Sequence, residues 1–188
     1  MEIQLSWDLF IIVFFVIIVA YSYIIGKYQT LKIILSSYIA ILSADAIGSL
    51  IEKYMIGESP IINIATVHSS SNALIFIKII TFIFLTILLA TKGGFGIVAS
   101  QERSRFSSFL LTMTYGILSA GLIISTILVY ISGASLVDLT SVTENPLSQI
   151  SEQSQLVRLM IKNYNAWFSL PVVVFLISSF LGDSPEGS

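Results

Sequence analysis

The sequence predicts an all-α membrane protein with four transmembrane helices, a C-terminal amphipathic helix and a short apolar tail segment. The composition is the first reason: 55% of the 188 residues are hydrophobic and 11% are charged, whereas soluble domains carry about 25% charged residues. The second reason is four apolar stretches of roughly 20 residues, the length that an α-helix needs to cross a bilayer. Isolated strands cannot satisfy their backbone groups in lipid, so the many β-branched residues do not favour a sheet.

The predicted spans are separated by glycines and small polar residues. Gly26 begins a very short first turn, Gly57 opens a longer second loop, and Gly93-Gly94 ends the third span. Residues Ser69 to Asn72 predict the N-terminus of the third span, because serine and asparagine are favourable N-caps. The four spans are Trp7–Ile25, Thr30–Ile51, Asn72–Thr91 and Phe106–Ile131, and together they form a predicted transmembrane domain of residues 1–133.

Residues 134–188 form the predicted tail, which we expect outside the cytoplasm. Asn145-Pro146 favours the start of a helix. Residues Ile150 to Tyr164 mix apolar with charged side chains, which predicts an amphipathic helix on the membrane surface or on a partner. Trp167 to Leu181 is apolar but interrupted by Pro171, and its length of about 15 residues favours an interfacial or re-entrant segment. A fifth membrane crossing is the alternative for this last segment.

Lysine and arginine predict the orientation, because cytoplasmic loops carry an excess of both. The N-terminal arm has neither residue, and the second loop has only Lys53. The first and third loops are therefore predicted to be cytoplasmic, with the N-terminus outside, in a multi-pass protein of the inner (cell) membrane. The cytoplasmic positive anchors are Lys27, Lys32, Lys92, Arg103 and Arg105.

Two ionisable side chains lie inside predicted spans. Asp45 lies six residues before Ile51, the end of the second span, and Lys78 lies six residues after Asn72, the start of the third. At a rise of about 1.5 Å per residue, both are about 9 Å from the outer ends of antiparallel helices. Charges at this depth are costly in lipid, so we expect an ion pair in which each charge offsets the desolvation of the other. Lys78 alternatively extends toward the outer headgroups.

Asp8 is the third candidate for this intramembrane polar cluster of Asp45, Lys78 and Asp8, because it begins the first span on the same outer side. A carboxylate in a first turn also interacts favourably with the helix dipole, which gives Asp8 a purely structural alternative. The whole cluster likewise has two interpretations. It is either a satisfied structural pair or the lining of a polar path through the bundle.

Small residues recur every four positions in two of the spans, which predicts two ridges where helices approach closely. We expect such ridges to pack against other helices of the chain; contact with a second copy or with another membrane protein is the alternative. The first ridge is Ser36, Ala40, Ala44 and Gly48, and the second is Thr112, Gly116 and Ala120.

The composition excludes several functions. The net charge is −2 and no block of basic residues occurs, so nucleic acid is not expected as a partner. There is no cysteine and one histidine, His68, so no cysteine or histidine metal site is expected. Phosphate-binding loops, paired-histidine motifs and serine nucleophile elbows are absent from the sequence. We therefore expect a protein that is not an enzyme and has no cofactor, and whose main partner is the lipid bilayer.

The first span starts with Asp8 and ends at Gly26, with the small residue Ser22 between them, and the second ridge follows the aromatic Tyr115. With the polar tail helix of residues 147–164, this pattern resembles the colicin V production protein (CvpA) family of small bacterial inner-membrane proteins. The resemblance covers most of the four-helix region. Family members usually carry an arginine where this chain has Ile25, an Arg-Glu pattern where it has Gln29 and Thr30, and an arginine in the last-helix glycine motif where it has Ser119.

This resemblance implies a four-span protein linked to toxin export and envelope homeostasis, with no established enzymatic activity. The sequence leaves two alternatives open. One is a small oligomeric channel or transporter subunit in which Asp45 and Lys78 line a polar path. The other is a scaffold subunit of a larger membrane complex, bound through the two ridges and the tail helix.

Overall fold

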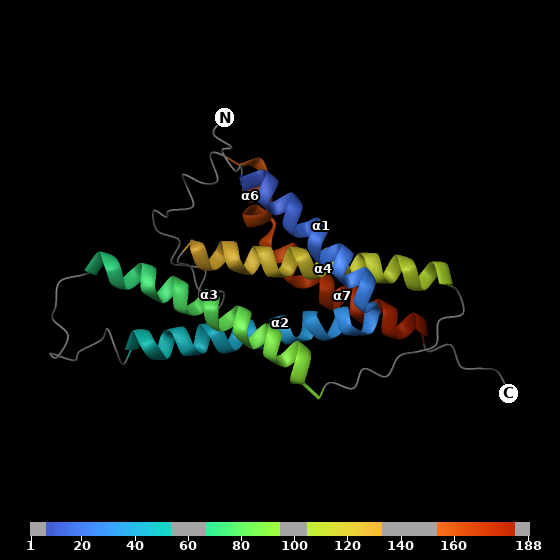
Figure 1. The fold of residues 1–188 in the computed structure, drawn as a ribbon, viewed down its shortest axis with the longest axis horizontal. Helices are drawn as coiled ribbons and strands as arrows, with labels where there is room; N and C mark the ends of the chain where they lie inside the picture. Colours follow the sequence, from blue (N-terminus) through green and yellow to red (C-terminus); the bar gives the residue numbers. More distant parts are fainter. Residues whose placement is uncertain (1–6, 54–66, 95–104, 133–153, 183–188) are drawn as a thin grey trace.

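The computed structural model describes residues 7–53, 67–94, 105–132 and 154–182, and within these ranges the regular structure is entirely helical. The all-α prediction is confirmed for this part of the chain. Figure 1 shows the arrangement of the helices. They are α1 (Trp7–Ile25), α2 (Lys27–Ile51), α3 (Val67–Lys92), α4 (Arg105–Ile131), α6 (Gln155–Lys162) and α7 (Tyr164–Gly182).

Four of these helices are long and apolar enough to cross a membrane, which indicates a membrane protein as predicted. They are α1, α2, residues Ala73–Lys92 of α3 and residues Ser108–Ile131 of α4. Helices α1 and α3 expose most of their apolar side chains, whereas α4 is the most buried of the four. An apolar exterior of this kind suits contact with lipid rather than with water.

The boundary between α1 and α2 is a single residue. Gly26 has a φ angle of 81°, a left-handed conformation that glycine adopts without strain. The Thr30 hydroxyl donates to the Gly26 carbonyl oxygen at 3.0 Å and so satisfies a backbone group at the turn. The first predicted span has the same bounds as α1. The second prediction began three residues late, because the chain turns at Gly26 alone and α2 already starts at Lys27.

The predicted N-terminus of the third helix was wrong, whereas the predicted span, Asn72–Thr91, lies within one residue of the apolar segment Ala73–Lys92. Helix α3 begins at Val67, so Ser69 to Asn72 lie inside the helix rather than at its N-terminus. The preference of serine and asparagine for the N-cap is a local effect of about 1 kcal/mol. It does not end a helix whose preceding residues are also helical, as they are here from Val67.

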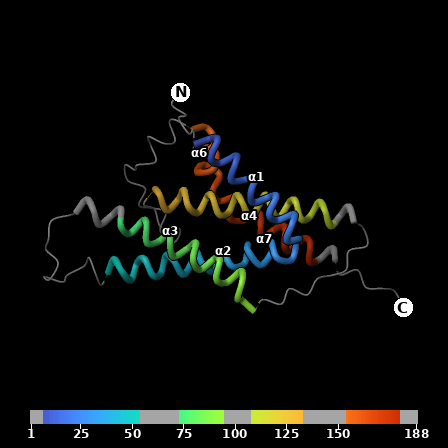
Figure 2. Tube along the Cα trace, in the orientation of Figure 1, coloured from blue at the N-terminus to red at the C-terminus, as the bar shows by residue number. Residues whose placement is uncertain are grey.

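Helix α4 occupies the centre of the bundle and contacts α1, α2, α3, α6 and α7 (Figure 2). Gly116 lets α1 approach closely: a Cβ atom added there would lie 3.0 Å from Ser22 Cβ and 3.4 Å from Val19 Cα. One turn and a half further along α4, the ring of Trp167 from α7 fills the space above Gly121. Glycine at both positions is therefore a packing requirement of this arrangement.

Helices α6 and α7 differ in length from the two segments predicted for the tail. Asn145-Pro146, the predicted helix start, lies outside the described residues; α6 begins after Ser154, whose hydroxyl accepts a hydrogen bond from Val157 N at 3.0 Å. Helix α7 has 19 residues instead of about 15, because Pro171 lies within the helix and does not end it. The axes of α6 and α7 meet at 62°. The domain boundary at residue 133 and the interfacial or re-entrant placement of the tail stay predictions.

We predict that Gly121→Ala destabilises the protein, because the added Cβ would lie 2.0 Å from Cε3 of Trp167. Overpacking costs about 1–3 kcal/mol, and this exceeds the gain of about 1 kcal/mol expected from helix propensity. Thermal unfolding in detergent measures the effect, and Trp167→Leu in the same chain should restore part of the loss. Gly94→Ala is the matched control, since its Cβ would have no atom within 4 Å. A more stable Gly121→Ala variant would contradict the packing argument.

Candidate functional site

The predicted ion pair between the second and third spans is present. Lys78 Nζ of α3 lies 3.4 Å from Asp45 Oδ1 of α2, and the two side chains are only 13% and 3% exposed. Each charge therefore has its partner within the protein rather than in solvent. The equal depth expected from counting residues along two antiparallel helices explains why these two side chains meet.

Gly48 makes room for the stem of Lys78. A Cβ atom at Gly48 would lie 2.4 Å from Lys78 Cε and 2.8 Å from Lys78 Cγ. The lysine therefore lies across the face of α2, and its ammonium group reaches Asp45 about one turn away from Gly48. The alternative in which Lys78 extends toward the headgroups does not describe this conformation.

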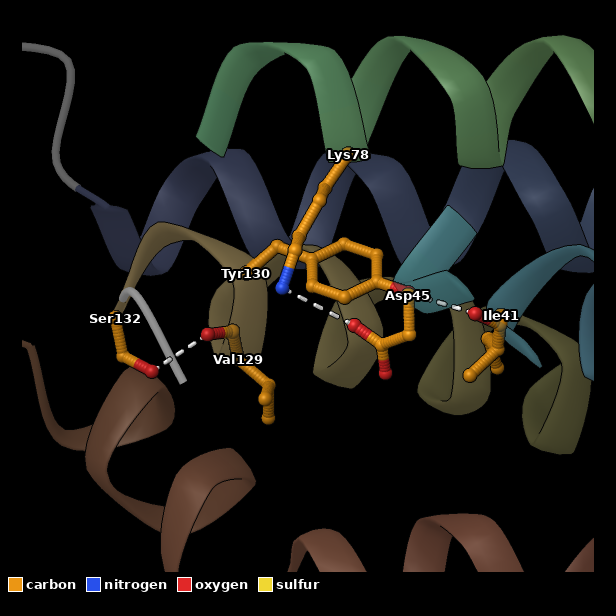
Figure 3. A network of polar contacts seen from close by, with 6 residues as sticks. All are labelled: Ile41, Asp45, Lys78, Val129, Tyr130 and Ser132. Atoms are coloured by element: carbon orange, nitrogen blue, oxygen red, sulfur yellow. Dashed lines mark hydrogen bonds and ion pairs between the residues drawn. The ribbon is translucent and has the colours of Figure 1, made fainter. Parts of the chain in front are cut away.

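Tyr130 brings α4 to the same place. Its hydroxyl donates to the Ile41 carbonyl oxygen at 3.1 Å, one helical turn before Asp45 on α2. Its ring also packs edge-on against Phe82 of α3, with centroids 6.2 Å apart. Figure 3 shows Asp45, Lys78 and Tyr130 converging from three helices. The ion pair is thus enclosed on one side by an aromatic ring that is itself anchored to the backbone of α2.

Asp8 has different partners from the ones that the sequence suggested. Its Oδ1 atom accepts hydrogen bonds from the Ser154 hydroxyl and from Leu156 N, the latter at 3.1 Å. The carboxylate therefore binds the N-terminus of α6 while it sits in the first turn of α1. Both positions are favourable for a negative charge. Asp8 joins α1 to α6, and within the described residues its hydrogen bonds lie with α6 rather than with Asp45 or Lys78.

Both predicted ridges are buried inside the chain. Ser36, Ala40 and Ala44 have no exposed surface, and Gly48 is buried beneath Lys78. On α4, Thr112, Gly116 and Ala120 are also buried. The ridges do not meet at their glycines, because Gly116 faces α1 and Gly48 faces α3. A partner that bound through these ridges would have to displace helices of the chain itself.

The predicted positive anchors are only partly described. Lys27 Nζ lies 5.0 Å from the ring centroid of Tyr28, Lys32 is half-buried, and Lys92 is exposed in the last turn of α3. Arg105 is the first residue of α4, and Arg103 lies outside the described residues. The first turns of α2 and α4 lie at the same end of the bundle (Figure 1). This arrangement agrees with the prediction that the first turns of α2 and α4 face the same compartment.

Comparisons with protein-family models, with curated proteins and with solved structures find no match for this chain. The resemblance to the colicin V production protein family therefore stays a hypothesis, and the site must be interpreted from its own geometry. Within the described residues no group of three or more His, Cys, Asp or Glu side chains could hold a metal ion.

Sequence reasoning missed Tyr130 and the contact between Trp167 and Gly121. Tyr130 lies at the end of α4, where tyrosine is ordinarily assigned to the membrane interface. Its role depends on how α4 is rotated about its own axis, because its hydroxyl reaches Ile41 only when Tyr130 faces the interior of the bundle. Counting residues gives no signal for this contact, because residue 130 lies about 1.5 Å from the outer end of its predicted span and Asp45 lies about 9 Å from the end of its own.

We predict that Lys78→Met destabilises the protein by up to about 3–5 kcal/mol, because it leaves the Asp45 carboxylate buried without its cation. Asp45→Asn in the same chain should recover much of the loss, since the double variant buries no charge. A double-mutant cycle measured by unfolding in detergent tests this coupling. Lys92→Met, which removes an exposed lysine from the same helix, is the control. Additive effects of the two substitutions would show that the ion pair does not couple α2 to α3.

Proposed function

We propose that this chain is a non-enzymatic accessory protein of the inner membrane, which supports toxin export or envelope homeostasis as its resemblance to the colicin V production protein family implies. The observation that carries the proposal is the ion pair of Lys78 and Asp45. Both charges are satisfied inside the chain, and Gly48 and Tyr130 fix them in place. A pair enclosed in this way favours a structural role, because a conducting residue needs access to water or to the transported ion.

The proposal includes an orientation. The N-terminus lies outside the cytoplasm, and the first turns of α2 and α4 face the cytoplasm. The lysines and arginines near these turns support this orientation by the positive-inside rule. Helix α6 lies near the outer surface, where it buries Val157 and Met160 against the bundle and exposes Arg158 and Lys162. Such a distribution suits an amphipathic helix at the headgroup level.

A second candidate function, a small channel or transporter subunit, is favoured by one observation. Five hydroxyl groups are buried in the described part of the bundle without a hydrogen-bond partner: Ser22, Ser36, Thr86, Ser119 and Ser125. Other buried hydroxyls bond the carbonyl one turn earlier, as Ser37 does with Ile33 and Thr126 with Leu122. An unpartnered buried hydroxyl costs about 1–3 kcal/mol, and polar groups that line a water-filled path avoid this cost.

We predict that a cysteine introduced at Gly94, after the end of α3, reacts with an impermeant maleimide only when the cytoplasmic face is accessible. The chain has no natural cysteine, so the label reports one position. The measurement compares intact cells with inverted membrane vesicles. Labelling in intact cells would contradict the proposed orientation.

We predict that the purified protein conducts no ions in liposomes, because its intramembrane charges neutralise each other in a closed contact. Proteoliposomes carrying the wild type or Asp45→Asn should show the same low flux as empty liposomes at every pH tested. Ser49→Ala, an exposed position on the same helix, is the matched control. Ion flux that is lost in the Asp45→Asn variant and kept in the Ser49→Ala variant would contradict the accessory function and support the channel.

The accessory function also has a direct test. Cells that lack the protein should take up more of an impermeant dye than wild-type cells, and expression of the chain should reverse the defect. Asp45→Asn combined with Lys78→Met should still complement, because it keeps the apolar packing of α2 and α3. Loss of complementation by a double variant that is stably inserted would show that the charges themselves are used.

A further inference from the structure

Helix α7 is long enough to cross the hydrocarbon region. Its 19 residues correspond to about 28 Å at about 1.5 Å per residue, against a hydrocarbon thickness of about 30 Å. The interfacial or re-entrant segment predicted from the sequence had a shorter length, about 15 residues. Together with α6, this helix passes the same test of length and composition as the four other spans.

The contacts of α7 show its direction. Trp167 near its start packs on Gly121 of α4, and Ser178 near its end bonds the hydroxyl of Tyr115. Residue numbers rise along α7 as they fall along α4, so the two helices are antiparallel. A helix that runs antiparallel alongside a membrane-spanning helix, and stays helical to Gly182, does not turn back as a re-entrant segment does.

The α6–α7 pair covers the bundle from one end to the other. It begins beside the N-terminus of α1, where Asp8 accepts hydrogen bonds from Ser154 and Leu156 N. Val157 and Met160 of α6 then pack with Ile11 at this end of α1. Figure 1 shows α7 ending toward the opposite end, where α1 ends and α4 begins. The pair thus extends along the molecule in the same direction as α1.

Two polar groups of α7, the Phe168 carbonyl and the Ser178 hydroxyl, bond tyrosines of α2 and α4, and such bonds suit a membrane-embedded helix. Pro171 has no N–H group and leaves the Trp167 carbonyl without its partner in the helix. The Tyr38 hydroxyl of α2 donates to the adjacent carbonyl, that of Phe168. Pro171 is itself buried in the bundle. A segment lying on the membrane surface could bond water at these positions and would need no tyrosine from α2.

We propose that α7 forms a fifth membrane span, which follows α6 after the break at Asn163 and places the end of α7 on the same side as the turn at Gly26. The N-terminus and the C-terminus of the described chain then lie on opposite sides of the membrane. This revises the prediction of a tail that stays wholly outside the cytoplasm. It also changes where a partner of the C-terminal residues must be: on the side of the α1–α2 turn.

Three single-cysteine variants test this topology, because the chain has no cysteine of its own. Gln29→Cys reports the side of the α1–α2 turn, Gln155→Cys reports the side on which α6 begins, and Ser188→Cys reports the C-terminus. Each variant is labelled with an impermeant maleimide in right-side-out and in inverted vesicles. We expect Ser188→Cys to label strongly in the vesicles that label Gln29→Cys and near background in those that label Gln155→Cys.

The opposite result would overturn the fifth span. Labelling of Ser188→Cys together with Gln155→Cys, or labelling from neither side, would place the end of α7 on the surface where it starts or within the membrane. Variants are compared only when gel filtration in detergent gives the wild-type profile, and a C-terminal reporter domain with compartment-dependent activity gives a second readout. The test compares the labelling of Ser188→Cys with that of the two other variants, so its outcome does not depend on which face is cytoplasmic. The fifth span can therefore be disproved while the proposed orientation stands.

Discussion

The contact between Lys78 and Asp45 determines how α2 and α3 pack, and the position of α4 follows from it. Neither charge is stable alone at that depth, so the two helices must meet at a rotation and height that bring the side chains within about 4 Å. The flexible lysine stem then needs space on α2, which only a residue without a side chain provides at position 48. Tyr130 completes the arrangement by tying α4 to the same turn of α2.

Glycines also make room for a neighbouring helix where α4 contacts α1 and α7. Between helices in lipid there is little hydrophobic drive, so association depends on close packing and on hydrogen bonds. Gly116 admits the backbone of α1 near Ser22, and Gly121 admits the ring of Trp167 from α7. The interfaces of α4 with α1 and with α7 therefore each combine a glycine on α4 with a specific group on the neighbouring helix. This pairing makes the packing sensitive to a single added methyl group.

The sequence predicted those features that depend on position along one helix. The bounds of α1 follow from an apolar run that ends at Gly26, and the pairing of Asp45 with Lys78 follows from equal residue counts on antiparallel spans. Features that depend on rotation or on long-range docking could not be derived in this way. Asp8 illustrates the limit, because its partners Ser154 and Leu156 are more than 140 residues away in the chain. The small-residue ridges predicted close contacts but not which helix fills each one.

The tail helices extend the principle that governs the ion pair: a polar group within the bundle needs a partner from another helix. Tyr38 and Tyr115 supply hydroxyls to α7, as Tyr130 supplies one to α2. Three tyrosines on α2 and α4 thus bond polar atoms of neighbouring helices inside the bundle. An aromatic residue suits this task, because its ring packs as an apolar side chain while its hydroxyl reaches a distant acceptor. The charges of the ion pair and polar groups of the broken helix thus all have partners on other helices. The five buried hydroxyls without a hydrogen-bond partner are the exception in the described part of the bundle.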